Sequence, residues 1–265
     1  MTAADAQGML VGVDFTADSV RLLLASESGE TVDRETWELP ELPDEEAWSW
    51  ELGGRISTLF ARQEAAHWAL GIGVACPGIV DGSTGVLVRS AGQPAWHGLN
   101  VVAALRRNIE APIVALNRTA AALQAEANQG VAVHVADALY VSLRDIPSAA
   151  VMTGARLVGG HTQSAGALPA LPAFEALEAD AKRDAADFER CAGVLADAAA
   201  LLDPELVILE GAESDIGALG PLLQSVIDEV APGPAVVSAD LGEAGALVGA
   251  MLAAGVVAYE GLRRQ

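Results

Sequence analysis

The sequence predicts an α/β fold in which at least part of the sheet is parallel. Short apolar runs alternate with segments of helical periodicity, which is the pattern of strand-helix-strand units. Two pairs of apolar runs are separated by short polar turns, and these pairs predict hairpins. With 265 residues, of which 52% are hydrophobic, the chain can build one large domain or two smaller ones.

The first part of the chain predicts an antiparallel meander followed by alternating helices and strands. Residues 9–14 and 20–25 form a hairpin, residues 31–38 add a third strand, and Pro40 and Pro43 end it. The next elements are a helix over 44–63 with Asp44 as N-cap, a strand over 68–76, two short strands within 79–89, a helix over 101–109 capped by Asn100, a strand over 113–117 and a helix over 119–128.

The second half repeats the opening theme of strand, short polar turn and strand. Residues 138–143 and 149–152 form this second hairpin, which indicates a weak internal repeat. A long helix over 173–202, a strand over 206–209, another helix, a strand over 235–237 and a terminal helix over 243–262 complete the chain. Small residues in the terminal helix predict close packing against the first sheet.

Charge and cysteine content exclude several classes of partner. The chain has 36 acidic and 15 basic residues and a formal net charge of −21, which argues against nucleic acids and acidic membranes as partners. Cys76 and Cys191 are too few for a disulfide framework or a four-thiolate zinc site. No secretory signal is visible at the start, and the apolar stretch over 245–259 is shorter than the ~20 residues of a membrane span. We therefore expect a cytoplasmic protein.

A series of motifs lies in order along nearly the whole chain. They are residues 11–14 (VGVD), 71–81 (GIGVACPGIVD), 91–96 (AGQPAW), 111–117 (APIVALN), 165–166 (AG), 202–208 (LDPELVI) and 241–250 (LGEAGALVGA). The series resembles the ROK family of sugar kinases and sugar-responsive repressors. This resemblance implies a two-domain actin-like ATPase (ribonuclease H-like) fold that forms homodimers or other homo-oligomers. One subdomain would comprise residues 1–113 with 245–265, and a shortened second would comprise 114–244.

The resemblance implies a catalytic base that this sequence lacks. Active ROK kinases have an Asp directly after the Asn that corresponds to Asn117, where it takes the proton from the attacking sugar hydroxyl. Here that position is Arg118, and a guanidinium cannot act as a base at neutral pH. Two interpretations of Arg118 stay open: it binds an anionic ligand such as a sugar phosphate, or it pairs with one of the many acids.

The two phosphate-binding turns that the resemblance implies have lost their glycines. The first is Asp14-Phe-Thr-Ala and the second is Arg144-Asp-Ile-Pro-Ser, so we expect side chains to stand where the ATP phosphates would lie. Two residues remain as candidates for cofactor binding. Asp14 matches the family's magnesium- or phosphate-positioning acid, although a turn or cap role is the alternative. Gly211 remains of the glycine-rich nucleotide loop.

The implied sugar site and zinc segment are eroded as well. Gln93 stands where the family has an Asn, and Ala167 and Ala170 replace its Glu and His. Gln93, Asn117 and Arg118 are therefore the candidates for substrate binding. The segment that carries the family's cysteine cluster is shortened, so we expect no zinc and no other metal.

These losses together predict a ROK homologue without phosphotransfer activity, a pseudokinase that acts in ligand sensing or protein interaction and needs no cofactor. The alternative is an active, glucokinase-like carbohydrate kinase that uses Mg-ATP through remodelled loops. The repressor branch of the family adds a winged helix-turn-helix, for which the roughly eight residues before the first strand leave no room. A role as an oligomeric scaffold also stays open.

Overall fold

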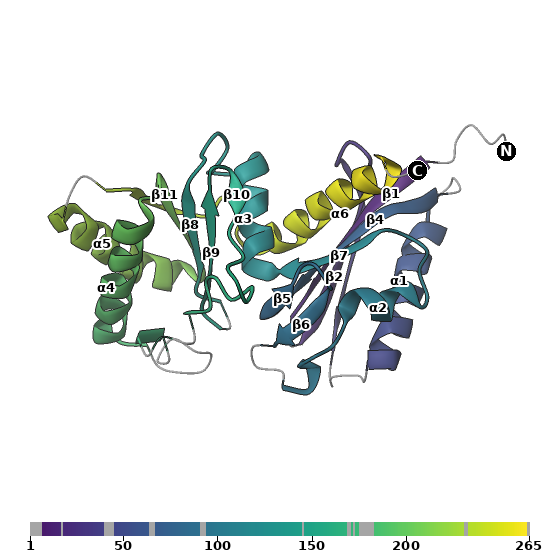
Figure 1. Ribbon diagram of the computed structural model, residues 1–265, viewed down its shortest axis with the longest axis horizontal. Coiled ribbons are helices and arrows are strands. Elements are labelled where there is room, and N and C mark those ends of the chain that lie inside the picture. Colours follow the sequence, from purple (N-terminus) through teal and green to yellow (C-terminus); the bar gives the residue numbers. More distant parts are fainter. Residues whose placement is uncertain are drawn as a thin grey trace. The chain divides into compact units, whose positions relative to one another are not determined.

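The apolar runs of the sequence form two five-stranded mixed sheets, one in each of two units of the chain (Figure 1). The first unit comprises residues 1–121 and 246–265, and the second comprises residues 122–245. The computed structural model describes residues 7–16, 18–39, 45–63, 67–90, 94–144, 146–168, 171, 173–174, 183–230 and 233–263. It has the α/β fold that the sequence predicts, with sheets flanked by helices.

The sheet of the first unit has the strand order β3-β2-β1-β4-β7. Strands β1, β2 and β3 pair antiparallel as the predicted meander, and β4 and β7 extend the sheet in parallel from β1. Their bounds are β1 (Gln7–Phe15), β2 (Ser19–Ser26), β3 (Thr31–Glu38), β4 (His67–Cys76) and β7 (Ile113–Asn117). A separate hairpin of β5 (Ile79–Asp81) and β6 (Val86–Arg89) follows β4.

Helices cover both faces of this first sheet. On one face, apolar residues of α1 (Glu45–Ala61) and α2 (Val101–Arg106) pack with Val11, Val13 and Phe15 of β1. On the other face, α6 (Gly245–Arg263) packs through Leu247 and Met251 onto Leu10 and Leu23. Because side chains alternate along a strand, β1 sends its odd-numbered residues from 11 to 15 into the α1 side.

Helix α6 lies so close to the sheet that side chains would not fit between them. A Cβ atom on Gly73 would lie 1.9 Å from the backbone oxygen of Ala250, and one on Gly71 would lie 2.3 Å from that of Ala254. The apolar stretch of this helix, Gly242–Gly261, is longer than our sequence estimate, and within the described residues it alone has the length and composition to cross a membrane. Half of it is buried against the first unit, as in a core helix.

The sheet of the second unit repeats the topology of the first. Its order is β10-β9-β8-β11-β12, with three antiparallel strands followed by two parallel ones, which confirms the predicted repeat. The strands are β8 (Ala138–Ser142), β9 (Ser148–Thr153), β10 (Arg156–Leu157), β11 (Leu206–Glu210) and β12 (Ala235–Ser238). Helices α4 (Ala185–Leu202) and α5 (Glu213–Val230) pack on one face of this sheet.

Two boundaries differ from the sequence estimates. The expected subdomain border after residue 113 would cut through β7, whereas β7 pairs with β4 and belongs with the start of α3 (Arg118–Gln129) to the first unit. Helix α4 begins at Ala185 rather than near 173. Asp184 caps it, and a reciprocal bond from Asp187 completes a capping box. The predicted cap Asp44 lies outside the described residues.

Candidate functional site

The carboxyl ends of the parallel strands in the first unit bring four side chains to one edge of the sheet. Asp14 ends the part of β1 that pairs with β4, where it lies opposite Ala75, and Cys76 of β4 lies opposite Asn117 of β7. Arg118 follows as the first residue of α3. In open α/β sheets this edge is where ligands bind, so these residues are the candidate site.

Asp14 is completely buried and holds two arginines. Arg118 donates through Nε to Oδ1 at 2.6 Å and through Nη2 to Oδ2 at 3.4 Å. Arg21, from the neighbouring strand β2, donates through Nε to Oδ2 at 3.1 Å and adds a short Nη2 contact to the same oxygen. Both oxygens of the carboxylate are therefore bound by guanidinium groups.

The buried charge of Asp14 influences its surroundings. An unpaired carboxylate in this position would lose its hydration, and the two guanidinium groups compensate that loss. The neighbouring Cys76 thiol is fully buried, and its pKa is raised well above the ordinary value, first by burial and second by the charge of Asp14. The thiol is therefore protonated at neutral pH and does not serve as a nucleophile.

Asp14 does not fit the magnesium-positioning role that the sequence resemblance implies. Mg²⁺ requires oxygen ligands in near-octahedral geometry, and a bound cation would meet two guanidinium groups already on the carboxylate. The turn after Asp14 does not fit a phosphate either. The backbone N–H of Thr16 donates to Ser19 O at 2.8 Å, and that of Ser19 donates to the Thr16 hydroxyl at 3.0 Å. These amides are satisfied within the turn.

Phe15 corrects one sequence expectation about this turn. We expected its side chain to stand where phosphate would lie, but its ring is fully buried in the core. Its centroid lies 5.3 Å from that of Trp48 and 4.9 Å from that of Trp96. The cause is strand alternation, since Phe15 shares the inward face with Val11 and Val13.

The three predicted substrate-binding residues differ in where the structure places them and in what they contact. The Oδ1 atom of Asn117 caps α3 by accepting from the backbone N–H of Thr119 at 2.9 Å and of Ala120 at 3.1 Å, while its Nδ2 donates to Gly78 O. Asn117 therefore has a structural task in this site. Arg118 lies beside it and pairs with Asp14. Gln93 falls outside the described residues.

The second unit contains a separate ion pair at the equivalent edge of its sheet. Glu210 ends β11 and accepts from the Ser142 hydroxyl at 2.5 Å and from Nε of Arg144, which follows β8. The predicted cofactor residue Gly211 comes next, and a Cβ there would lie 3.1 Å from Leu143 Cβ. Gly211 therefore allows close packing, and the structure places it in a different unit from Asp14.

Sequence reasoning missed Arg21, Arg144 and Glu210. Arg21 is the single charged residue in the apolar run of β2, and Glu210 closes the apolar run of β11. A charged residue inside a buried strand signals a buried partner. Arg144 was noted only as part of an altered phosphate turn.

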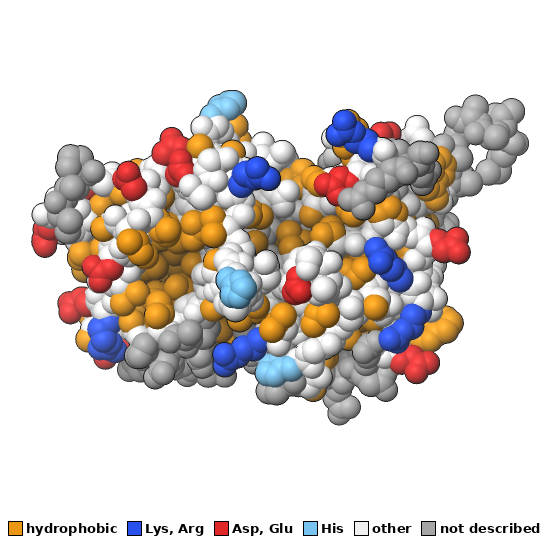
Figure 2. Space-filling model, in the orientation of Figure 1, with side chains coloured by type: hydrophobic (Ala, Val, Ile, Leu, Met, Phe, Trp, Pro, Cys, Tyr) orange, Lys and Arg blue, Asp and Glu red, His pale blue; other side chains and the backbone are white. Residues whose placement is uncertain are grey.

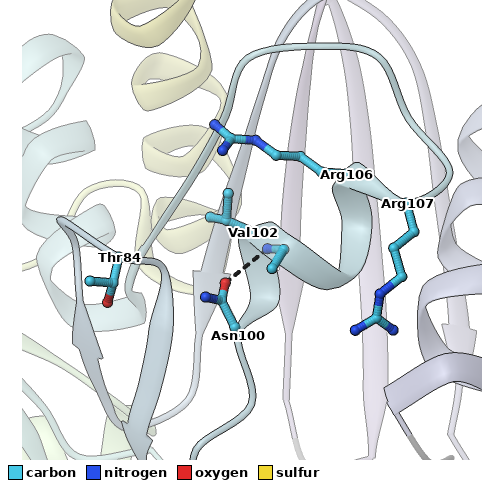
Figure 3. A pocket seen from close by; sticks show the side chains of 6 residues that line it. Thr84, Asn100, Val102, Arg106 and Arg107 are labelled. Atoms are coloured by element: carbon cyan, nitrogen blue, oxygen red, sulfur yellow. Dashed lines mark hydrogen bonds between the residues drawn. The ribbon is translucent and has the colours of Figure 1, made fainter.

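A cavity of about 360 Å³ lies elsewhere in the first unit, beside α2. Its lining is Thr84, Asn100, Val102, Ala103, Arg106 and Arg107. Arg106 and Arg107 extend to opposite sides of the helix, so their charges do not converge (Figure 3). No sequence-predicted site residue lines this cavity. Within the described ranges, no three His, Cys, Asp or Glu side chains gather as metal ligands.

The family model for the ROK family matches residues 10–168. This match covers more than half of the chain, including most of β1, all of β7 and both implied phosphate turns. The chain belongs to the ROK family. No curated protein matches the ROK chain at a significant level.

Solved structures of ROK proteins share the fold. A ROK family transcriptional regulator, a homologue of the E. coli MLC protein, is 16% identical with a TM-score of 0.77, over 97% of this chain and 80% of that one. A ROK hexokinase from Thermus thermophilus is 18% identical with a TM-score of 0.75, over 97% and 100%. A ROK glucokinase from Streptomyces griseus, in complex with glucose and AMPPNP, is 17% identical with a TM-score of 0.66, over 93% and 99%. This ROK chain therefore has the actin-like fold of kinases and regulators alike.

Proposed function

We propose that this ROK protein transfers no phosphate and instead senses a ligand of the sugar class. The observation that carries the proposal is the buried Asp14, whose two oxygens are bound by Arg118 and Arg21. A base has to accept a proton and a magnesium ligand has to offer a lone pair, and this carboxylate is committed to two guanidinium groups.

Both turns that hold phosphate in active relatives support the proposal. In the first unit, the amides of Thr16 and Ser19 bond within the turn. In the second unit, the amide of Arg144 at the start of the turn donates to the Ser142 hydroxyl at 3.4 Å, and the side chain of Arg144 pairs with the Glu210 carboxylate. Backbone amides that bond internally cannot also cradle a phosphate.

The proposed ligand is a sugar or an anionic sugar, because the glucokinase relative was solved with glucose. We place the protein in the cytoplasm as a homodimer or other homo-oligomer, without zinc and without a nucleotide cofactor. The charge of −21 disfavours nucleic acid and membrane partners. On the face drawn in Figure 2, Lys and Arg side chains are separated from one another, and a nucleic-acid surface would need them gathered.

The proposal is tested by calorimetric titration of the protein with Mg-ATP, at low and at physiological salt. We expect no saturable binding up to millimolar nucleotide. A coupled assay for ADP, with glucose, mannose and N-acetylmannosamine as acceptors, should give no turnover. An active ROK glucokinase in parallel reactions controls for the assay.

The alternative is an active carbohydrate kinase that uses Mg-ATP through its altered loops. Saturable nucleotide binding together with sugar-dependent ADP release would establish this alternative and overturn the proposal. An Arg118→Asp variant sharpens the test because it restores the residue type that active relatives have there. If both turns exclude nucleotide, this variant stays inactive.

A further inference from the structure

The cavity beside α2 contains hydrogen-bond donors that no described residue uses. The guanidinium group of Arg106 makes no hydrogen bond or ion pair within the described ranges, although its side chain lines the cavity. Asn100 is half used: its Oδ1 accepts from the backbone N–H of Ala103 at 2.8 Å, whereas its Nδ2 has no partner in the same ranges. Guanidinium and amide nitrogens donate and do not accept, so a ligand of this cavity has to bring acceptor atoms.

A hairpin and a helix together border the cavity. The backbone N–H of Val101 donates to Gly85 O at 3.0 Å, which holds the turn between β5 and β6 beside the first turn of α2. Thr84 of that turn and Arg106 of the helix therefore line one space (Figure 3). Arg107 extends to the other side of α2, so the two guanidinium groups do not act together on one ligand.

The charges around the cavity favour an anion with a single negative charge. Arg106 compensates one charge, in a chain whose net charge is −21. Asp81, at the end of β5, adds a negative charge, because hydrogen bonds from the side chains of Ser83 and then Thr84 lower the pKa of its carboxyl group. A phosphate ester carries more than one negative charge at neutral pH, and the excess would stay uncompensated. A carboxylate carries one, and both its oxygens fit one edge of a guanidinium group.

The rest of the cavity wall is apolar and fixed in place. Val102 is buried and packs against Gly85, where a Cβ atom would lie 2.3 Å from Cγ2 of Val102. Gly85 has a φ of 75°, so both the turn and this contact require glycine. Val102 and Ala103 line the cavity and have only apolar side chains. The volume of about 360 Å³ is near the lower end of the ~300–1,000 Å³ typical of small-molecule sites, so the ligand is small.

We propose that the cavity beside α2 binds a small aliphatic monocarboxylate. Its carboxylate accepts from Arg106 and from Nδ2 of Asn100, and its hydrocarbon chain lies against Val102. Both donors belong to one helix and its cap, and such pre-organisation lowers the entropy that binding costs. None of these residues belongs to the candidate site around Asp14, and the inference does not depend on the proposed function.

The test is a titration of the protein with butyrate, acetate, butylamine and inorganic phosphate, followed by ¹H–¹⁵N NMR. We expect butyrate to shift the backbone amide signals of Thr84 and of residues 101–106 until they saturate. Acetate should bind more weakly, by about fourfold for each methylene group of butyrate that is buried. Butylamine, which has the same chain with a positive charge, should cause no saturable shift. Shifts that do not saturate with butyrate, or tighter binding of inorganic phosphate than of butyrate, would overturn the inference.

Variants assign the binding to named side chains. Arg106→Gln removes the guanidinium group and should weaken butyrate at least about tenfold. Asn100→Asp keeps an oxygen that caps α2 but replaces the Nδ2 donor with a charged oxygen, so it should also weaken butyrate. Arg89→Gln is the matched control, because Arg89 is an exposed arginine of the same unit outside the cavity lining. This control loses the same charge and should bind butyrate as the unchanged protein does.

Urea unfolding separates loss of the site from loss of the fold. Since Arg106 has no partner among the described residues, Arg106→Gln should keep the free energy of unfolding of the unchanged protein. Unchanged butyrate affinity in Arg106→Gln would contradict the inference. Equal weakening by Arg89→Gln and Arg106→Gln would also contradict it, because it would show a general effect of net charge rather than a site.

Discussion

The two units place an acid at the same edge of the same sheet topology but treat it differently. In the first unit the acid is Asp14, on the central strand β1. It is completely buried, and arginines from β2 and α3 pair with it. In the second unit the acid is Glu210, on β11, the strand that pairs in parallel with the central strand β8. The side chain of its arginine partner Arg144 is 35% exposed. The repeat therefore conserves where charge gathers, and it does not conserve how deeply the charge is buried.

The units agree in having a buried apolar residue where the first strand ends. Phe15 follows Asp14, Leu143 follows Ser142, and both side chains are buried in the core of their own unit. A turn that active relatives use for phosphate is thus closed from within by an apolar anchor. The comparison shows that the start of each implied phosphate turn is packed into the core of its own unit.

The largest effect is expected when this anchor is removed. Phe15→Ala should lower the free energy of unfolding by about 3–5 kcal/mol, because it leaves a cavity between Trp48 and Trp96. Leu143→Ala should cost about 2–4 kcal/mol by the same mechanism in the second unit. Urea unfolding measures both. Trp50→Ala, at a 62% exposed position, is the control and should change little.

A smaller effect separates the two acids. Asp14→Asn should lower the free energy of unfolding by about 2–4 kcal/mol, because it leaves two guanidinium groups without their buried counter-charge. Glu210→Gln should cost only about 1–2 kcal/mol, since Arg144 can turn to water. Urea unfolding of both variants measures the two losses of unfolding free energy, and we compare them. Equal losses would mean that burial does not distinguish the clusters, and Glu51→Gln, in an exposed pair with Arg55, is the control.

The sequence predicted the strands well because most are apolar runs between polar turns, and the third strand alternates apolar and polar residues. Residues 9–14, 20–25 and 31–38 became β1, β2 and β3, and the second hairpin became β8 and β9. Chemistry at single positions was also readable, since Arg118 cannot be a base. The direction of Phe15 was missed because its neighbours in the turn, rather than its place in the alternation, were used to interpret it.

The partners of Asp14 could not be predicted from sequence. Arg21 lies seven residues away and Arg118 lies 104 residues away, and the pairing of β1 with β2, of β1 with β4 and of β4 with β7 brings them together. Asn117 was expected in the substrate site, but its capping bonds depend on where α3 begins. Such assignments depend on register, which apolar periodicity does not determine.

The smallest effect concerns the two thiols. Burial raises the pKa of Cys191 in the second unit from 9.0 to about 11, and in the first unit burial and then Asp14 raise that of Cys76. An unfolded thiol loses its proton at lower pH than a folded one, so the free energy of unfolding should fall as pH rises above about 9. Urea unfolding at several alkaline pH values measures this fall. Asp14→Asn should reduce the share of this fall that is due to Cys76, and Cys191→Ala should remove the share that is due to Cys191. A free energy of unfolding that does not change with pH in this range would contradict both expectations.

Because helix α6 follows the whole second unit in the chain, one face of the first sheet is covered only late in translation. The sheet of the first unit is complete once residue 117 has been made, but one of its faces stays open until residues 246–263 leave the ribosome, after the entire second unit. Leu10 and Leu23 lie on that face and stay without their packing partners from α6, although their own strands are among the first to be made. A nascent chain therefore carries an uncovered apolar sheet face for as long as residues 118–245 are being translated, and a chaperone that binds extended apolar segments would bind this protein at that face.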